Sequence, residues 1–239
     1  LEGPWLAEAF KGAHDAALLT APTLPDVTAL LDAARGTVRM VTIAPELAGA
    51  LETIELLAQR GVVAAVGHTD ADHAVTLAAI AAGARGTTHL FNAMPGLHHR
   101  HPGPVLALLA DPRVWLELIV DGVHVASPLA AFVLHQFPDR VVLVTDAVAA
   151  AASHDGDYIL GALPVEVRDG VEVGCGSDPV DATSLPADYL GLAEVGRLRP
   201  GARADLVVDV ACGSGPMSRE LARPGRTIIG VDLSQRELE

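Results

Sequence analysis

Short runs of apolar, largely β-branched residues recur along the chain, and each run ends in a polar or ionisable residue. The runs lie at 37–46, 61–69, 84–92, 113–124 and 140–147. A short run that is apolar on both faces is typical of a strand buried within a parallel sheet. The pattern therefore predicts five such strands.

Helical patterns separate several of these runs, at 45–61, 70–84 and 127–137. Gly61 is a helix stop, an Asp cap opens the second pattern, and the third opens on Ser127 with Pro128 in its first turn. Strand, polar end and helix in alternation predict βαβ units and thus an α/β fold with a parallel sheet.

The polar residues gather where the predicted strands end. Such residues follow five of the strands, and a sixth has the same setting if a strand lies upstream of residue 1: Glu46, His68, His89, His124, Asp146 and Glu2. In a parallel barrel the carboxyl ends of all strands converge on one face, so these side chains are expected to share one pocket.

A metal centre follows from that convergence. Glu2, His68 and His89 would supply one carboxylate and two imidazoles, a suitable donor set for Zn²⁺ or a similar divalent ion with one position open to water. Asp146 would then act beside that water as a proton acceptor.

A purely structural role is the alternative to each of these assignments. A single histidine at a strand end is more often a hydrogen-bonded structural residue than a ligand, but five or six strands that end this way are hard to explain by packing. Glu46 is the weakest member, because it would also serve as a first-turn acid of the following helix. The sequence HHRH at 98–101 lies in a Pro/Gly-bounded loop and is expected to be solvated, Arg100 being a special case treated below.

Composition narrows the classes of protein and partner. The chain has 239 residues, enough for one α/β barrel of roughly 250 residues. Its net charge of -14 argues against nucleic acid or an anionic membrane as a partner, and no apolar run is long enough for a membrane span. Two cysteines are too few for a disulfide framework, which favours a cytoplasmic location.

The motifs then resemble a known family. LEGPWL, KGAH, VTIAPE, GHTDA, TTHLFNAM, HRHPG, VDGVHV and LVTDA are similar, in order and spacing, to the motif series of the N-acetylglucosamine-6-phosphate deacetylases of the amidohydrolase superfamily. The likeness runs from residue 1 to about 173. It implies an α/β fold of the partial (β/α)8 TIM-barrel type, lacking the first strands and the amino-terminal β-domain.

The resemblance also implies residue roles. Glu2, His68 and His89 would bind a divalent metal, zinc first with iron, cobalt or manganese as alternatives, and Asp146 would be the catalytic acid and base. The residues that would meet the sugar phosphate substrate are Ala13, His14, Asn92, Ala93, Asp121, Gly122, Val123 and His124. Arg100 would reach the substrate phosphate of a neighbouring subunit, which implies a homodimer.

The carboxyl-terminal part departs from this pattern. Residues 174–208 resemble a shortened carboxyl-terminal segment of the family, and residues 209–239 resemble the first βαβ unit of a class I S-adenosylmethionine-dependent methyltransferase. In that unit Gly213 and Gly215 would permit a tight strand-to-helix turn, and Asp232 would take the position of a ribose-binding acid.

Three hypotheses follow from the sequence. The chain is a metal-dependent deacetylase, an S-adenosylmethionine-binding methyltransferase fragment, or an inactive remnant that binds a sugar phosphate or a partner. The first predicts a bound metal that is lost when His68 or His89 is replaced, and the second predicts cofactor binding without any metal.

Overall fold

The fold is described by a computed structural model, which covers residues 1–146 and four further strands at 156–160, 163–167, 206–210 and 227–231. The chain divides into two units. Leu1–Ile119 and Ser127–Val144 form the first, and Val120–Ala126 with Thr145–Glu239 form the second. Each unit is described by itself.

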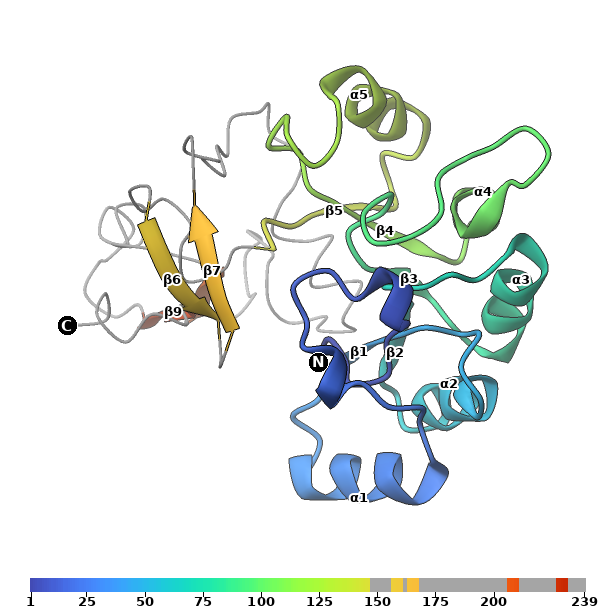
Figure 1. Cartoon of the computed structure of the whole chain (residues 1–239), viewed down its shortest axis with the longest axis vertical. Helices are drawn as coiled ribbons and strands as arrows, with labels where there is room; N and C mark the ends of the chain where they lie inside the picture. The colour runs from blue at the N-terminus through green and yellow to red at the C-terminus, as the bar shows by residue number, and fades with distance from the viewer. Residues whose placement is uncertain (147–155, 161–162, 168–205, 211–226, 232–239) are drawn as a thin grey trace, which may run out of the picture. The chain divides into compact units, whose positions relative to one another are not determined.

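The first unit is built on a five-stranded parallel sheet whose strands follow the chain order (Figure 1). Its strands are β1 (Met40–Ile43), β2 (Val63–Val66), β3 (Gly86–Thr87), β4 (Trp115–Leu118) and β5 (Val141–Leu143). All four pairings are parallel. Each strand lies within a predicted run, so the prediction of a parallel α/β sheet is confirmed, although the strands are shorter than the runs.

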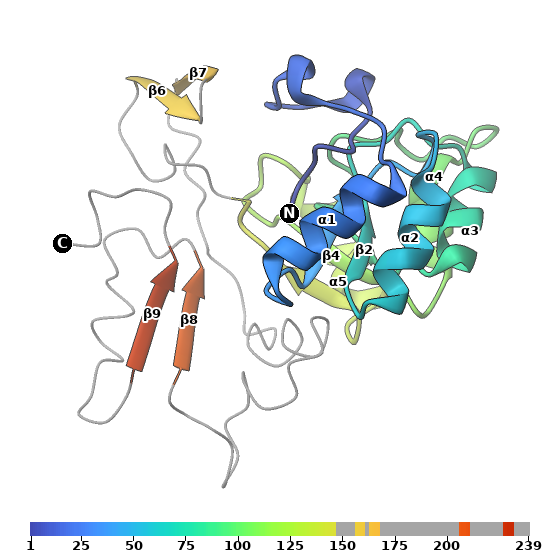
Figure 2. The ribbon, with the colours of Figure 1, turned by 90° about the horizontal axis from the view of Figure 1, so that it is seen from below.

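Five helices accompany the sheet: α1 (Leu24–Ala34), α2 (Ala50–Gln59), α3 (His73–Ala82), α4 (Gly103–Ala110) and α5 (Ser127–Gln136). All lie on one side of the strands (Figure 1), and α1, α2, α3 and α4 are consecutive neighbours (Figure 2). Two short 3-10 helices, η1 (Glu8–Phe10) and η2 (Ala16–Leu18), precede them. The helices thus pack on one face of the sheet, and the loops that carry the polar residues follow the carboxyl ends of its strands.

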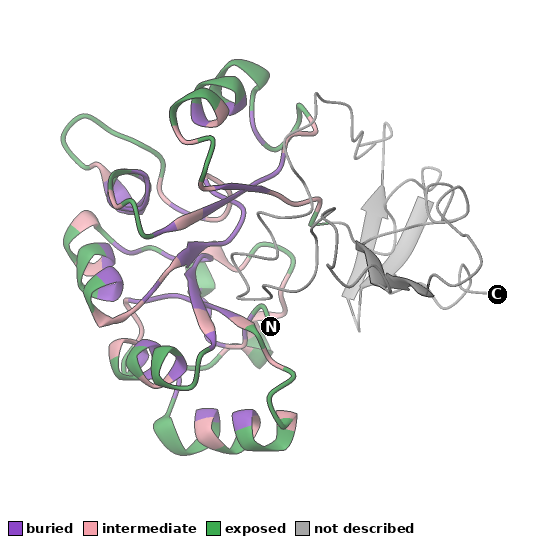
Figure 3. Cartoon of the chain, turned by 180° about the vertical axis from the view of Figure 1, so that it is seen from behind, coloured by how far each residue is buried: buried purple, intermediate pink, exposed green. Residues whose placement is uncertain are grey.

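The core lies between the sheet and the helices. In Figure 3 the strands and the inner faces of the helices are buried, whereas the outer helix faces are exposed. Ile43, Ile54, Ile80, Leu108 and Leu116 are among the largest fully buried side chains. Burial of such side chains contributes roughly 1.5–3 kcal/mol each, and this packing fixes the strand ends that carry the polar residues.

For two of the three predicted helices, the observed start agrees with the prediction. Asp72 caps α3 by accepting a hydrogen bond from the Val75 amide at 2.8 Å, and α5 begins at Ser127 as predicted. The predicted start of α2, near residue 45, was wrong, because that helix begins at Ala50 after Gly49. Glu46 therefore lies outside the helix and is not its first-turn acid.

The described residues of the second unit include two strand pairs. β6 (Gly156–Leu160) and β7 (Leu163–Val167) form an antiparallel hairpin, and β8 (Leu206–Val210) pairs in parallel with β9 (Thr227–Val231). Gly213, Gly215 and Asp232 lie outside the described residues. Among the described helices, none combines the length and apolarity that crossing a membrane requires.

Candidate metal centre

Glu2 is held beside the sheet by backbone pairing. The Thr42 amide donates to the Leu1 carbonyl at 2.8 Å, the Leu1 nitrogen donates to the Met40 carbonyl at 2.8 Å, and Glu2 forms a parallel bridge with Thr42. The start of the chain therefore lies beside β1, joined to it by one isolated bridge. This pairing places Glu2 next to Thr42 of β1.

His68 and His89 follow β2 and β3, and both have unusual backbones. Their φ angles are 47° and 29°, in the left-handed region. For a residue with a Cβ this conformation costs about 1–2 kcal/mol, so it persists only where the surroundings enforce it. Both imidazoles are buried, at 5% and 3% exposure for the residues.

The three side chains meet at one point. Glu2 Oε1 lies 2.6 Å from His68 Nε2 and 3.5 Å from His89 Nε2, and the two Nε2 atoms are 3.0 Å apart. Donor atoms of a tetrahedral zinc, each about 2.0–2.1 Å from the ion, are separated by about 3.4 Å. The trio reaches this geometry after shifts of less than an ångström, an estimate from the same bond lengths: the Glu2 carboxylate moves away from His68, and the two imidazoles separate slightly.

The hydrogen bond made by His68 Nδ1 determines what its other ring nitrogen, Nε2, can bind. His68 Nδ1 lies 2.7 Å from the Phe10 carbonyl oxygen, which only accepts, so Nδ1 carries a proton. In the neutral ring, Nε2 then directs a lone pair toward the Glu2 carboxylate and His89. Such a contact is repulsive unless a proton or a metal cation lies between the atoms. A backbone carbonyl that orients an imidazole in this way is typical of metal-binding histidines.

The ionisation of Glu2 also indicates that the three side chains suit a metal cation. Burial raises the pKa of the Glu2 carboxyl, but hydrogen bonds from His68 and His89 outweigh burial and hold that pKa below its ordinary value. Glu2 is therefore a carboxylate at neutral pH. A carboxylate and two imidazoles form a hard-to-borderline donor set that suits Zn²⁺ and its neighbours in the first transition series.

His14 joins this group from the preceding loop. Its Nε2 lies 3.3 Å from Glu2 Oε1, and its ring meets the His68 ring edge-on at 4.9 Å between centroids. Gly12 permits the approach, because a Cβ there would lie 3.0 Å from His68 Cε1. The loop thus covers His68, while Ala13 at its tip is exposed.

The loop after β3 carries the predicted phosphate-side residues. Asn92 donates to the His89 carbonyl at 3.3 Å, and Ala93 has a left-handed φ of 49°. Arg100 and the histidines at 98, 99 and 101 are exposed, which confirms that HHRH is solvated. This histidine sequence does not form a metal cluster with the ligand trio.

The remaining predicted residues belong to the second unit. Asp121 accepts hydrogen bonds from the amides of Val123 and His124, and it pairs with His124 Nδ1 at 2.5 Å. Asp146 is exposed and has a left-handed φ of 52°, as His68 and His89 also have left-handed φ angles. The roles of these residues, and of Gly122, stay predictions.

Glu46 does not belong with the ligands. Its carboxylate accepts hydrogen bonds from the Thr69 hydroxyl and the Asp70 amide. The sequence did not predict a role for Thr69, although Thr69 stands in GHTDA beside His68. Its partner Glu46 lies 23 residues away, so no local pattern marks this threonine.

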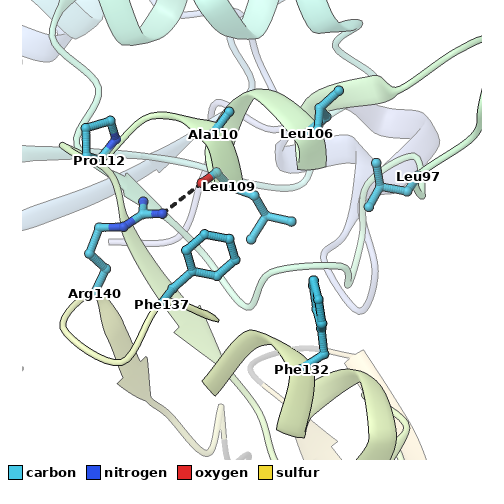
Figure 4. A pocket seen from close by; sticks show the side chains of 8 residues that line it. All are labelled: Leu97, Leu106, Leu109, Ala110, Pro112, Phe132, Phe137 and Arg140. Carbon is cyan, nitrogen blue, oxygen red and sulfur yellow. Dashed lines mark hydrogen bonds between the residues drawn. The ribbon is translucent and has the colours of Figure 1, made fainter. Parts of the chain in front are cut away.

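A separate pocket of about 640 Å³ lies beside α4 and α5 (Figure 4). Its lining is aliphatic and aromatic apart from Arg140, which donates to the Leu109 carbonyl at 2.7 Å and stacks on Phe137. It contains no metal ligand and no candidate site residue, so it offers no chemistry of its own.

Comparison with curated proteins finds deacetylases of amino-sugar phosphates. The chain is 37% identical over 234 residues to the N-acetylgalactosamine-6-phosphate deacetylase of Escherichia coli O157:H7, which covers 87% of the chain and 62% of that relative. It is 40% identical over 172 residues to the N-acetylglucosamine-6-phosphate deacetylase of Vibrio furnissii, with 72% and 43% covered. No protein-family model matches the chain.

Solved structures give the same result. The chain is similar, with a TM-score of 0.77 and 44% identity, to a mutant N-acetyl-D-glucosamine-6-phosphate deacetylase from Mycobacterium smegmatis in complex with N-acetyl-D-glucosamine-6-phosphate, covering 85% of the chain and 62% of that structure. For the Thermotoga maritima enzyme the values are 0.76, 29%, 85% and 62%. The prediction of a partial (β/α)8 barrel of the amidohydrolase type is thereby confirmed. The chain spans 43 to 62% of the length of these four proteins.

Proposed function

We propose, from the premise that the chain is homologous to N-acetylglucosamine-6-phosphate deacetylases over most of its length, that it belongs to an enzyme that hydrolyses the acetamide of N-acetylglucosamine 6-phosphate. The products are glucosamine 6-phosphate and acetate, a step of amino-sugar catabolism. The observation that carries the proposal is the meeting of Glu2, His68 and His89 at neighbouring strand ends.

Glu2, His68 and His89 would hold the metal ion, with zinc as the first choice and iron, cobalt or manganese as alternatives. When bound, such an ion polarises the acetyl carbonyl and lowers the pKa of water. The Glu2 carboxylate and the His68 ring are suited to it, because the carboxyl group is ionised and the Phe10 carbonyl holds the ring with Nε2 toward the other donors.

Asp146 supplies the proton transfers. Its carboxylate takes a proton from the attacking water as the C–O bond forms, and returns that proton to the nitrogen as the C–N bond breaks. The immediate products are acetic acid and the free amine, and transfer of the acid proton to the amine gives acetate and an ammonium group, so atoms and charge balance. The left-handed backbone of Asp146, shared with His68 and His89, is typical of residues held at functional sites.

The substrate contacts are assigned from the loops. Asn92, Ala93 and the backbone amides around them would cradle an anionic group, and His14 and Ala13 would lie beside the sugar. Residues 121–124 would also meet the substrate. Arg100, exposed on its loop, would reach the phosphate bound by a second copy in a homodimer. A cytoplasmic location suits a phosphorylated substrate.

The test measures zinc content and acetate release for the wild-type chain and for Asp146→Asn. N-acetylgalactosamine 6-phosphate serves as the competing substrate, because the Escherichia coli relative is named for it. We expect about one zinc per chain in both proteins, with turnover lost by a factor of about 10²–10⁴ in the variant. Full zinc occupancy with no turnover that depends on Asp146 would indicate an inactive sugar-phosphate binder instead.

One observation favours a second candidate for the tail. β8 and β9 pair in parallel, the arrangement that a βαβ cofactor-binding unit requires. Gly213, Gly215 and Asp232 would then contact S-adenosylmethionine. Calorimetric titration with S-adenosylmethionine tests this candidate, and absence of heat at millimolar cofactor would refute it.

A further inference from the structure

Thr69, directly after the ligand His68, connects loops that carry different ligands. The residue is fully buried. Its hydroxyl donates to Glu46 Oε2 at 2.5 Å and accepts from the Ala71 amide at 2.9 Å, so both functions of the hydroxyl are used. A buried hydroxyl satisfied in this way fixes the turn in which it stands.

Glu46 holds the same turn from the end of β1. While one carboxylate oxygen accepts from the Thr69 hydroxyl, the other accepts from the Asp70 amide at 2.6 Å. Hydrogen bonds to a carboxylate are shorter and stronger than neutral ones. With both oxygens engaged, Glu46 acts on the His68 loop and not on a metal ion.

The backbone of this turn extends the connection to the other ligands. The Thr69 amide donates to the Ala93 carbonyl at 3.1 Å, in the loop that follows His89. The His68 carbonyl accepts from the Ala7 amide at 2.8 Å, in the segment that begins with Glu2. One turn therefore contacts the loops of all three ligands.

We infer that Glu46 and Thr69 are positioning residues of the metal centre, which hold His68 and, through Ala93, the His89 loop in their left-handed conformations. The inference rests on the proposed function for the presence of the metal. Its physical basis is that a strained backbone persists only when its surroundings determine it, and this network surrounds the turn that carries His68.

The test compares zinc affinities, measured by competition with a chromophoric chelator on the full chain. Thr69→Val keeps the shape and removes the hydroxyl, Glu46→Gln removes the charge, and Thr69→Ser restores the hydroxyl. Thr76→Val is the matched control, because Thr76 is equally buried and its hydroxyl bonds only the Asp72 carbonyl within α3.

We expect zinc affinity to fall about 10–100-fold in Thr69→Val and Glu46→Gln, as for other residues that orient metal ligands, with Thr69→Ser and Thr76→Val close to wild type. Equal affinity in Thr69→Val and Thr76→Val would overturn the inference. If Thr69→Val does not fold, the half-exposed Glu46→Gln decides alone, and wild-type affinity in that variant would overturn the inference. A wild-type chain that binds no zinc would instead refute the proposed metal centre.

Discussion

Gly12→Ala provides a stringent test of how the metal centre is built, because the structure supplies a matched control. Gly12 has φ +56° and its missing Cβ faces His68 Cε1 at 3.0 Å, whereas Gly36 has φ +79° and open space around it. Both glycines are exposed. The two substitutions therefore share the backbone effect and differ only in the contact with His68.

The magnitudes follow from these contacts. A left-handed alanine costs about 1–2 kcal/mol, of which a less flexible unfolded chain offsets about 0.4–1 kcal/mol. Each variant should lose about 1 kcal/mol of unfolding free energy in urea, on the same estimates. At Gly12 the methyl must also reach an ordinary separation of about 3.5 Å, so the His68 ring shifts by about half an ångström, the limit for productive ligand geometry.

The assay is zinc affinity by chelator competition, read beside urea unfolding. We expect the zinc affinity of Gly12→Ala to be at least about tenfold lower than that of the wild type, the effect typical of changes to residues that orient metal ligands. The zinc affinity of Gly36→Ala should equal that of the wild type. If both variants lose stability equally and keep wild-type zinc affinity, the loop at Gly12 does not constrain His68 and the reasoning is refuted.

Other predictions concern stability. Arg140→Met should cost about 2 kcal/mol or more in urea unfolding, because Arg140 bonds the carbonyls of Leu109, Asp111 and Val114, and an unchanged midpoint would contradict this. The hydrogen bond from Arg113 lowers the pKa of Asp111 to about 2, so this pair stabilises the fold above the ordinary carboxyl pKa and the effect disappears as pH falls toward 2. Asp111→Asn should therefore be less stable than wild type at pH 6 by up to about 1 kcal/mol and equal to it near pH 2, as pH-dependent unfolding would show, whereas a deficit independent of pH would contradict the assignment.

The sequence predicted the sheet well because buried parallel strands have a local signature. All five strands lie in apolar runs, and His68 and His89 follow them at the expected positions. Helix α1 was missed although its signal was present, since Thr23 caps it and Pro25 lies in its first turn. Helix α4 is apolar on nearly every side, and such a short run does not distinguish a helix from a strand.

The details of the site depend on contacts between distant residues. Left-handed backbones at His68 and His89 have no local signature, because these angles are imposed by neighbouring loops. For the same reason Glu46 was assigned to a helix start, while its partners Thr69 and Asp70 come from the next strand end. The sequence indicates which residues carry the chemistry, and tertiary contacts decide how they are held.

X-ray absorption at the zinc edge tests the central claim most directly, since it reports the atoms bound to the ion. With Glu2, His68 and His89 as ligands, the zinc-loaded chain should show only nitrogen and oxygen at about 2.0–2.1 Å, with the multiple scattering of two imidazoles. In His89→Ala one imidazole should be lost. Sulfur at about 2.3 Å, from Cys175 or Cys212, or a spectrum unchanged in His89→Ala, would contradict the account.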